Sequence, residues 1–242
     1  MFNATLIMPV KNENLRNIDF KKYLDFVSEI LIVYKISASP LEMNIISNQI
    51  RLIDQETYTG KGSAIIVGLL NSSNDINIVV DADEPISVFE IESYLSQITN
   101  NADIGMVKGS RFLKTGGSED LTIVRYFGAY FFAKLTRLFF KVNWTEVVYG
   151  FWAINRKNID MGKIVEVLES PKTLFGPFKK IPYGHSFEFD QVLMLKSLKS
   201  GAKILELPSF ELARNFGKSS LTPLKDGFRT LIVILFERFY FK

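Results

Sequence analysis

The chain has no cysteine and a single histidine, His185, among its 242 residues. Without cysteine it can form no disulfide, no thiolate nucleophile and no cysteine-ligated zinc site. One histidine excludes a multi-histidine metal centre, so a bound cation must rely on carboxylates, carbonyls and water, which favour Mg²⁺ or Mn²⁺. The net charge of +3 is too small to indicate a nucleic-acid-binding protein. We expect His185 itself to be a solvated loop residue.

Long apolar runs are also missing. The most apolar stretches, 127–140 and 231–236, are interrupted or closed by Lys134, Arg137 and Glu237, and neither reaches the roughly 18 residues of a membrane span. The first nine residues lack the features of a signal peptide. We therefore expect a cytoplasmic protein.

The chain has enough apolar residues, 47%, for a sizeable core. We expect one α/β domain over residues 1–221. A C-terminal amphipathic helix over 222–242 would then pack on this domain or associate with a membrane.

Short apolar runs alternate with helical patterns through the first half of the chain, which predicts a mostly parallel, Rossmann-like sheet flanked by helices. The expected strands are Thr5–Met8, Ile30–Tyr34, Ile76–Val80, Ile104–Val107, Phe151–Asn155 and Lys203–Leu207. The expected helices are Leu15–Val27, Pro40–Gln49, Ser63–Leu70, Ser87–Ile98, Thr122–Lys141 and Phe189–Ser200, and a loop is expected over Leu174–Ser186. Ligands of such sheets bind beyond the carboxyl ends of the strands.

Two aspartates, Asp81 and Asp83, directly follow the expected strand Ile76–Val80. Where the chain turns, two carboxylates at this spacing can converge on one cation, with a diphosphate completing its ligand shell. Taken alone, the pattern is better explained by aspartates that cap a loop. Three further polar segments follow strands or open a helix at the same expected edge: Pro9–Glu13, Gly60–Ser63 and Lys108–Arg111. Together the four favour a nucleotide-diphosphate site, in which Lys61 and Gly62 suit phosphate or sugar oxygens.

An ordered series of segments resembles glycosyltransferase family 2, and within it the dolichol-phosphate mannose synthase-like and bacterial polysaccharide-type members. The series is Pro9–Glu13, Gly60–Gly62, Asp81–Asp83, Gly109–Arg111, Tyr149–Phe151, Phe187–Asp190, Leu207–Glu211 and Arg214–Leu221. The resemblance implies a GT-A fold, a UDP- or GDP-sugar donor, a divalent metal (Mg²⁺ or Mn²⁺), and a lipid-phosphate or glycan acceptor.

The resemblance also implies roles for individual residues. The nucleoside pocket would include Pro9 and Glu13, and the metal would be held by Asp81 and Asp83. Lys11 and Gly150 would belong to the substrate site. Arg111 would face a phosphate of the donor, and Arg125 the phosphate of the acceptor. One segment departs from the pattern: where relatives carry an acidic turn rich in Gly and Ser, this chain has 34–39, Tyr-Lys-Ile-Ser-Ala-Ser.

Three carboxylates compete for the role of the catalytic base that an inverting transfer needs. We rank Asp190 first, then Glu146, then Glu188. If Glu188 and Asp190 are both helical they point about 200° apart, so only one can face the site. The pair is equally well explained as acidic residues at a helix N-terminus. A lipid-phosphate acceptor, already ionised, would barely need a base.

Two expected helices interleave aromatic and basic side chains. The first carries Tyr126, Phe127, Tyr130 and Phe131 beside Lys134 and Arg137, and the last carries Phe228, Leu231 and Phe236 beside Arg229 and Arg238. Such stripes either pack on the sheet or on a second subunit, as in a homodimer, or lie in a membrane interface.

The sequence thus favours a metal-dependent transferase that moves a sugar from a nucleotide diphosphate to a polyprenyl phosphate or a glycan. A nucleotidyltransferase is the second enzymatic hypothesis, although Pro9–Glu13 lacks the Gly-rich, Arg-containing loop typical of that class. A nucleotide-sugar-binding module without turnover is the non-enzymatic alternative.

Overall fold

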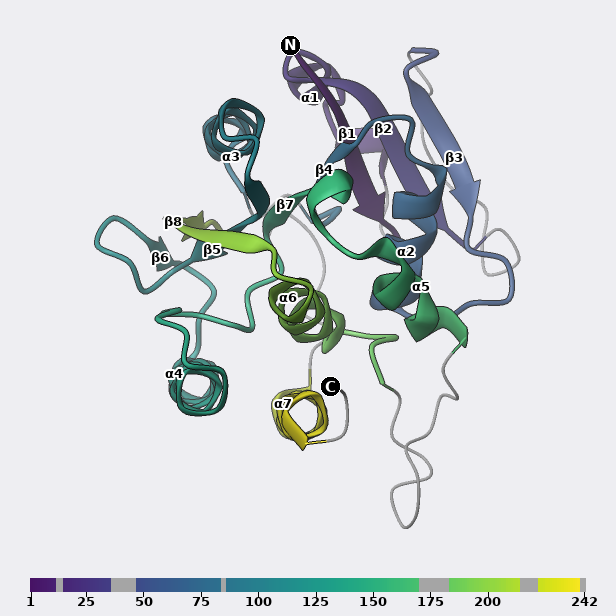
Figure 1. The fold of residues 1–242 in the computed structure, drawn as a ribbon. Coiled ribbons are helices and arrows are strands. Elements are labelled where there is room, and N and C mark those ends of the chain that lie inside the picture. Colours follow the sequence, from purple (N-terminus) through teal and green to yellow (C-terminus); the bar gives the residue numbers. More distant parts are fainter. Residues whose placement is uncertain (12–14, 36–46, 84–85, 170–182, 214–221, 240–242) are drawn as a thin grey trace.

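The computed structural model describes residues 1–11, 15–35, 47–83, 86–169, 183–213 and 222–239 (Figure 1). The strands are β1 (Phe2–Pro9), β2 (Val27–Tyr34), β3 (Ile50–Asp54), β4 (Ile76–Val79), β5 (Ile104–Ser110), β6 (Gly117–Ser118), β7 (Trp152–Asn155), β8 (Lys203–Pro208) and β9 (Phe210–Glu211). The helices are α1 (Lys21–Leu24), α2 (Lys61–Asn71), α3 (Val88–Asn100), α4 (Ile123–Phe140), α5 (Met161–Glu169), α6 (Phe189–Lys199) and α7 (Pro223–Phe239). Two 3₁₀ turns, η1 (Leu15–Asn17) and η2 (Arg156–Asn158), complete the described elements.

The main sheet has the strand order β3-β2-β1-β4-β7-β5-β8 within the described residues. All neighbouring pairs are parallel except those of β7, which runs antiparallel to both β4 and β5. The prediction of a mostly parallel α/β sheet flanked by helices is therefore confirmed. The antiparallel β7 brings the segment before it, residues 141–151, to the same edge as the carboxyl ends of β4 and β5.

Each face of the sheet carries its own apolar core, because successive side chains of a strand point to opposite faces. On β1, Ile7 packs into a cluster with residues of α2, α5, α6 and α7. Its neighbours Leu6 and Met8 pack on the other face with α3 and with Tyr23 of α1. The chain thus builds three layers, with the helices covering both sides of the sheet (Figure 1).

Helix α4 projects from the sheet and packs against α7, which in turn lies on α6 (Figure 1). It begins after Thr122, whose hydroxyl accepts a hydrogen bond from the Arg125 backbone, and ends at Lys141 in the left-handed conformation. Within α4 only the face of Ala129, Ala133 and Thr136 is fully buried. The exposed large apolar residues of α4 are Ile123, Val124, Tyr126, Phe127, Tyr130, Phe131 and Leu138.

Several local predictions were wrong. The expected helix Leu15–Val27 is broken into η1 and the single turn α1, and Val27 already begins β2. The helical spacing of its apolar residues arises because Leu15, Tyr23 and Val27 are all buried in the core, and not because the segment is a continuous helix. The sequence did not indicate strand β3 or helix α5. Most of the expected helix over 40–49 and most of the loop over 174–186 lie outside the described residues.

Helix α7 is anchored to the domain rather than separate from it. Its Ile232, Val233 and Ile234 join the core, and its buried Glu237 pairs with Lys199 and accepts a hydrogen bond from Tyr183. The boundary at residue 221 remains a prediction. No helix within the described ranges is long and apolar enough to cross a membrane.

Candidate active site

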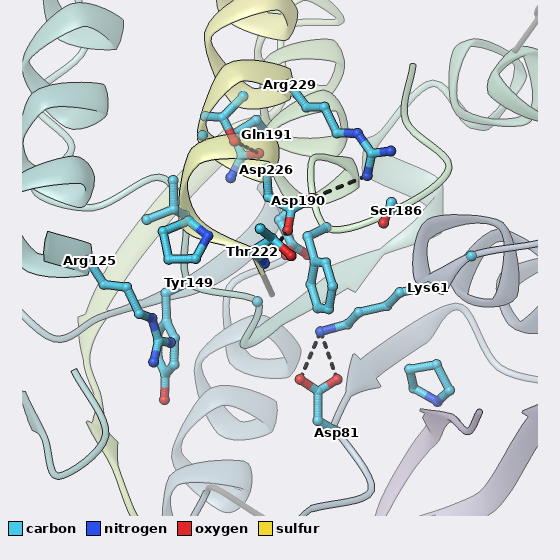
Figure 2. A pocket seen from close by; sticks show the side chains of 18 of the residues that line it. Lys61, Asp81, Arg125, Tyr149, Ser186, Asp190, Gln191, Thr222, Asp226 and Arg229 are labelled. Carbon is cyan, nitrogen blue, oxygen red and sulfur yellow. Dashed lines mark hydrogen bonds and ion pairs between the residues drawn. The ribbon is translucent and has the colours of Figure 1, made fainter. Parts of the chain in front are cut away.

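A cavity of about 930 Å³ lies beyond the carboxyl ends of β1 and β4. One wall is the sheet edge with the N-terminus of α2, and the opposite wall is formed by α4 and the first turns of α7 (Figure 2). Residues of the sheet side include Pro9, Lys11, Lys35, Lys61, Asp81, Asp83, Arg111 and Asp190, and residues of the helical side include Val124, Arg125, Phe131, Thr222, Lys225, Asp226, Phe228 and Arg229. The fold therefore gathers the polar segments of the sequence around one large space.

Lys61 and Asp81 form the central ion pair of the sheet side. The Lys61 ammonium lies 2.7 Å from Asp81 Oδ1 and 2.8 Å from Oδ2, so it contacts both oxygens (Figure 2). Burial alone would lower the pKa of Lys61, but the negative charges of Asp81 and Asp190 outweigh it and raise that pKa. Lys61 therefore stays charged at neutral pH and balances the carboxylates around it.

The glycines beside Lys61 are required by close packing. Gly60 has φ 102°, and a Cβ there would lie 2.0 Å from the carbonyl oxygen of His185. A Cβ on Gly62 would lie 2.3 Å from the carbonyl oxygen of Gly184. Gly62 is buried and does not line the cavity, so the prediction that it contacts substrate is not supported by its position. Its small size instead lets the chain before α6 close against α2.

His185 is not the solvated residue that the sequence suggested. Its side chain is buried, with Nδ1 2.8 Å from the hydroxyl of Ser63 on α2. This contact joins the segment before α6 to the start of α2. We therefore assign His185 a structural role.

Asp190 lies in the cavity wall on the first turn of α6. It is buried, and its Oδ1 accepts a hydrogen bond of 2.9 Å from the indole N–H of Trp152 on β7. Burial raises the pKa of Asp190, and the charge of Lys61 and the Trp152 hydrogen bond only partly oppose this. At Gly150 a Cβ would lie 2.9 Å from Asp190 Oδ2 and 3.1 Å from Lys61 Nζ. Glycine at this position thus leaves room for both side chains at the cavity.

Arg111 reaches the cavity wall but is already bound to two carboxylates. Its Nε, Nη2 and backbone N–H all donate to Glu146, and its Nη1 donates to Glu211 at 2.8 Å. The guanidinium also stacks over the ring of Tyr149, 4.6 Å from the centroid. A donor phosphate that binds Arg111 as predicted would have to share the guanidinium with these two carboxylates.

Two of the three predicted bases do not face the cavity. Glu146 has no exposed side-chain surface, because it lies behind Arg111 and is held by it. Glu188 is also fully buried, its Oε1 accepts from the backbone of Ser186, and burial raises its pKa. The positions of Glu146 and Glu188 therefore do not support a role as base, because both carboxylates are buried away from the cavity. Asp190 is the one of the three that lines the cavity.

Arg125 lines the helical wall at the start of α4. Its Nη1 donates to the backbone carbonyl and the carboxylate of Asp120, at 2.9 and 3.1 Å. Its Nη2 lies 3.9 Å from Glu211, which thereby stands between Arg111 and Arg125. Arg125 is thus in the cavity, as its predicted contact with an acceptor requires, but its charge is balanced by two acidic residues.

The expected nucleoside pocket is described only in part. Pro9 and Lys11 line the cavity at the end of β1, whereas Glu13 lies outside the described residues. Lys35 lines the cavity at the end of β2, and the segment after it is likewise outside the described part of the chain.

Asp81 and Asp83 both line the cavity, and their carboxylates are the hard oxygen ligands that Mg²⁺ and Mn²⁺ prefer. Among the described residues no three acidic or histidine side chains come together to hold a metal by themselves. One or two carboxylates with substrate phosphates and water are the usual Mg²⁺ environment, so this pair fits such an ion.

The sequence did not reveal the polar residues that helix α7 adds to the cavity. Asp226 accepts hydrogen bonds from the backbone of Thr222 and from Arg229, and Thr230 donates to Gln191 of α6. The spacing of Lys225 and Arg229, four residues apart on α7, could have indicated that both face the cavity, but it is equally typical of a solvated helix face.

No described protein family and no curated protein sequence matches this chain. Its structure is similar to glucosyl-3-phosphoglycerate synthase from Mycobacterium tuberculosis, solved with Mn²⁺, UDP and phosphoglyceric acid, at 14% identity and a TM-score of 0.62 over 98% of this chain and 78% of that one. A complex of that synthase with Mn²⁺, UDP-glucose and glycerol 3-phosphate matches at 15% identity and a TM-score of 0.60, over 98% and 79%. A mycobacterial protein matches at 12% identity and a TM-score of 0.64, over 98% and 74%. The chain therefore has the GT-A fold.

Proposed function

We propose that this protein transfers a sugar from a nucleotide-diphosphate donor to a phosphate-bearing acceptor. The observation that carries the proposal is the arrangement of Lys61, Asp81, Asp83 and Asp190 around one large cavity at the carboxyl edge of a GT-A sheet. Solved structures with this fold carry UDP or UDP-glucose with Mn²⁺ or Mg²⁺. The donor of this chain is then a UDP- or GDP-sugar.

The donor diphosphate would lie between the sheet edge and α2. Asp83, with Asp81, would hold Mg²⁺ or Mn²⁺, which neutralises the departing diphosphate when it is bound. Lys61 sits beside both aspartates and adds a fixed positive charge for the same phosphates. Pro9 and Lys11 would contact the nucleoside, because they line the cavity at the end of β1. The resemblance assigns Glu13 to the same pocket.

Asp190 is the group we propose as the base of an inverting transfer. An acceptor oxygen attacks the anomeric carbon, the bond from that carbon to the diphosphate oxygen breaks, and a hydroxyl acceptor passes its proton to Asp190. The Trp152 hydrogen bond holds one carboxylate oxygen, which leaves Oδ2 toward Gly150 and Lys61. A raised pKa brings this carboxyl closer to neutral pH, where a base works best.

The helical wall favours a lipid phosphate over a glycan as acceptor. Val124, Phe131 and Phe228 line the cavity and are also exposed, so an apolar surface runs from its interior to the outside of α4 and α7. Lys134 and Arg137 lie on the same helix, α4. This surface supports the proposal that the protein associates peripherally with an anionic membrane. The synthase complexes hold small phosphates instead, so both kinds of acceptor belong in the assay.

The test is a screen of UDP- and GDP-sugars with Mn²⁺, scored by stabilisation against heat and by release of nucleotide with polyprenyl phosphate, glycerol 3-phosphate or a glycan present. We expect metal-dependent stabilisation and acceptor-dependent release of UDP or GDP, both abolished in Asp83→Asn. Stabilisation without turnover would make the chain a binding module. Release of pyrophosphate from a nucleoside triphosphate would identify a nucleotidyltransferase.

A further inference from the structure

Three basic side chains that line the cavity are paired with carboxylates. Lys61 contacts both oxygens of Asp81, and Arg111 is bound by Glu146 and Glu211. Arg125 donates to Asp120 and lies near Glu211. An anion that binds at any of these three must share the cation with a carboxylate that the fold holds in place. Among the described residues, the other basic side chains that line the cavity are Lys11, Lys35, Lys225 and Arg229, and the last two lie on α7.

Helix α7 supplies two such cations. Arg229 donates through Nη1 alone to Asp226, at 3.1 Å, which leaves Nε and Nη2 with no partner among the described residues. Lys225 forms no ion pair within the described part of the chain and is exposed. The two residues are four apart on the helix, so their side chains lie on the same face, and both line the cavity.

The carboxylate of Asp226 orients Arg229 rather than closing the site. Its Oδ2 accepts from the backbone N–H of Thr222 at 2.7 Å, and its Oδ1 accepts from Arg229. The buried Asp226 thus fixes one edge of the guanidinium, while the planar group keeps donors for a second, bidentate partner. Of the two positive charges of Lys225 and Arg229, Asp226 offsets one.

The position of this pair suits the acceptor and not the donor. In Figure 2 the Asp226–Arg229 pair lies apart from the Lys61–Asp81 pair, beside which we propose that the donor diphosphate binds. A phosphate at Arg229 would therefore lie away from the donor diphosphate. The exposed Leu224 and Phe228 of the same helix turns offer apolar contacts to whatever the phosphate carries.

We propose that Arg229 and Lys225 of α7 form the binding site for the phosphate monoester of the acceptor. This rests on the proposed function, because it assigns the second substrate of that reaction. It also moves the recognition of the acceptor phosphate from Arg125, where the sequence placed it, to the C-terminal helix. A lipid phosphate and a small soluble phosphate ester share the chemistry that this site recognises.

The experiment measures phosphate binding by the full-length protein with UDP and Mn²⁺ present. One arm titrates glycerol 3-phosphate in solution by calorimetry, and the other measures flotation with phosphatidylcholine vesicles that contain farnesyl phosphate. The variants are Arg229→Gln, Lys225→Gln and the double variant. Arg238→Gln is the matched control, since Arg238 is an exposed arginine in the last turn of the same helix. Melting curves confirm that each variant is folded.

We expect each single variant to weaken binding about ten-fold and the double variant about a hundred-fold, with Arg238→Gln unchanged. Loss in the solution arm identifies a soluble phosphate ester, and loss only in the vesicle arm identifies a lipid phosphate. Unchanged binding by the double variant, or no binding of either probe by the wild type, overturns the proposal. UDP titrated alone separates the two ideas: if UDP with Mn²⁺ fails to bind, the proposed function fails, whatever the phosphate data show.

Discussion

Replacing Asp190 with asparagine should make the protein more stable and nearly inactive. The side chain is 4% exposed and lies near Asp81 as well as Lys61. Asparagine keeps the shape and the oxygen that accepts from Trp152 Nε1. It removes a buried charge that water no longer solvates, while Lys61 keeps its contact with Asp81.

The size of the gain in stability depends on pH. We expect about 0.5–2 kcal/mol at pH 8, the range typical of single changes that relieve a strained functional group. Because burial raises the pKa of Asp190, the wild type binds a proton here at a pH where the unfolded chain does not. Protonated Asp190 therefore contributes to the stability of the fold at low pH, and this contribution is lost as the pH rises through the pKa of Asp190 in the folded protein. The advantage of the variant should vanish below about pH 4, where the carboxyl is protonated in both states.

Urea unfolding at a series of pH values measures the gain, and nucleotide release measures the activity. With an acceptor that reacts through a hydroxyl group, we expect kcat to fall by about 10²–10⁴, the usual contribution of a general base. Asp103→Asn is the control, because its carboxylate is 66% exposed and pairs with the exposed Lys203. A variant with kcat within a few-fold of wild type would refute the role of Asp190 as base. A variant destabilised at pH 8 would refute the account of its burial.

Three further changes test the surrounding geometry. Arg111→Met should lower the free energy of unfolding, measured with urea, by about 3–5 kcal/mol, because Glu146 and Glu211 stay buried without their cation. A loss below about 1 kcal/mol would contradict this. Gly150→Ala should lower kcat, because the added Cβ would lie 2.9 Å from Asp190 Oδ2, and it should lower the melting temperature by no more than a few degrees. An unchanged kcat would contradict the close approach of residue 150 to Asp190. Lys61→Met removes a positive charge that lowers the pKa of Asp190, so that pKa should rise and the acid limb of the kcat–pH profile should move to higher pH. A shift to lower pH would contradict this effect of Lys61 on Asp190.

The strands that position the site could be predicted from the sequence because they are buried on both faces. The runs Ile76–Val79 and Ile104–Ser110 are mostly apolar and almost entirely buried, and the polar residues after them mark the strand ends. Strand β3 escaped prediction because it is an edge strand in which only Ile50 is buried. The segment 15–27 has helical apolar spacing, yet tertiary packing broke it into turns.

The partners of the charged residues could not be predicted, because they are far apart in sequence and meet only through the topology. Glu146 lies 35 residues from Arg111 and Glu211 lies 100, and neither distance carries a sequence pattern. As a result Arg111 looked available to a phosphate and Glu146 looked available as a base. The contribution of α7 was hidden for the same reason, since nothing local places Arg229 opposite the sheet edge.

The most direct test of the whole account is the titration of UDP into the wild-type protein with Mn²⁺ and again with a chelator. If the cavity holds a nucleotide diphosphate through a cation at Asp83, UDP should bind at least about ten-fold more tightly with Mn²⁺, a difference of about 1.4 kcal/mol. Equal affinity under the two conditions, or no binding in either, would contradict the central claim.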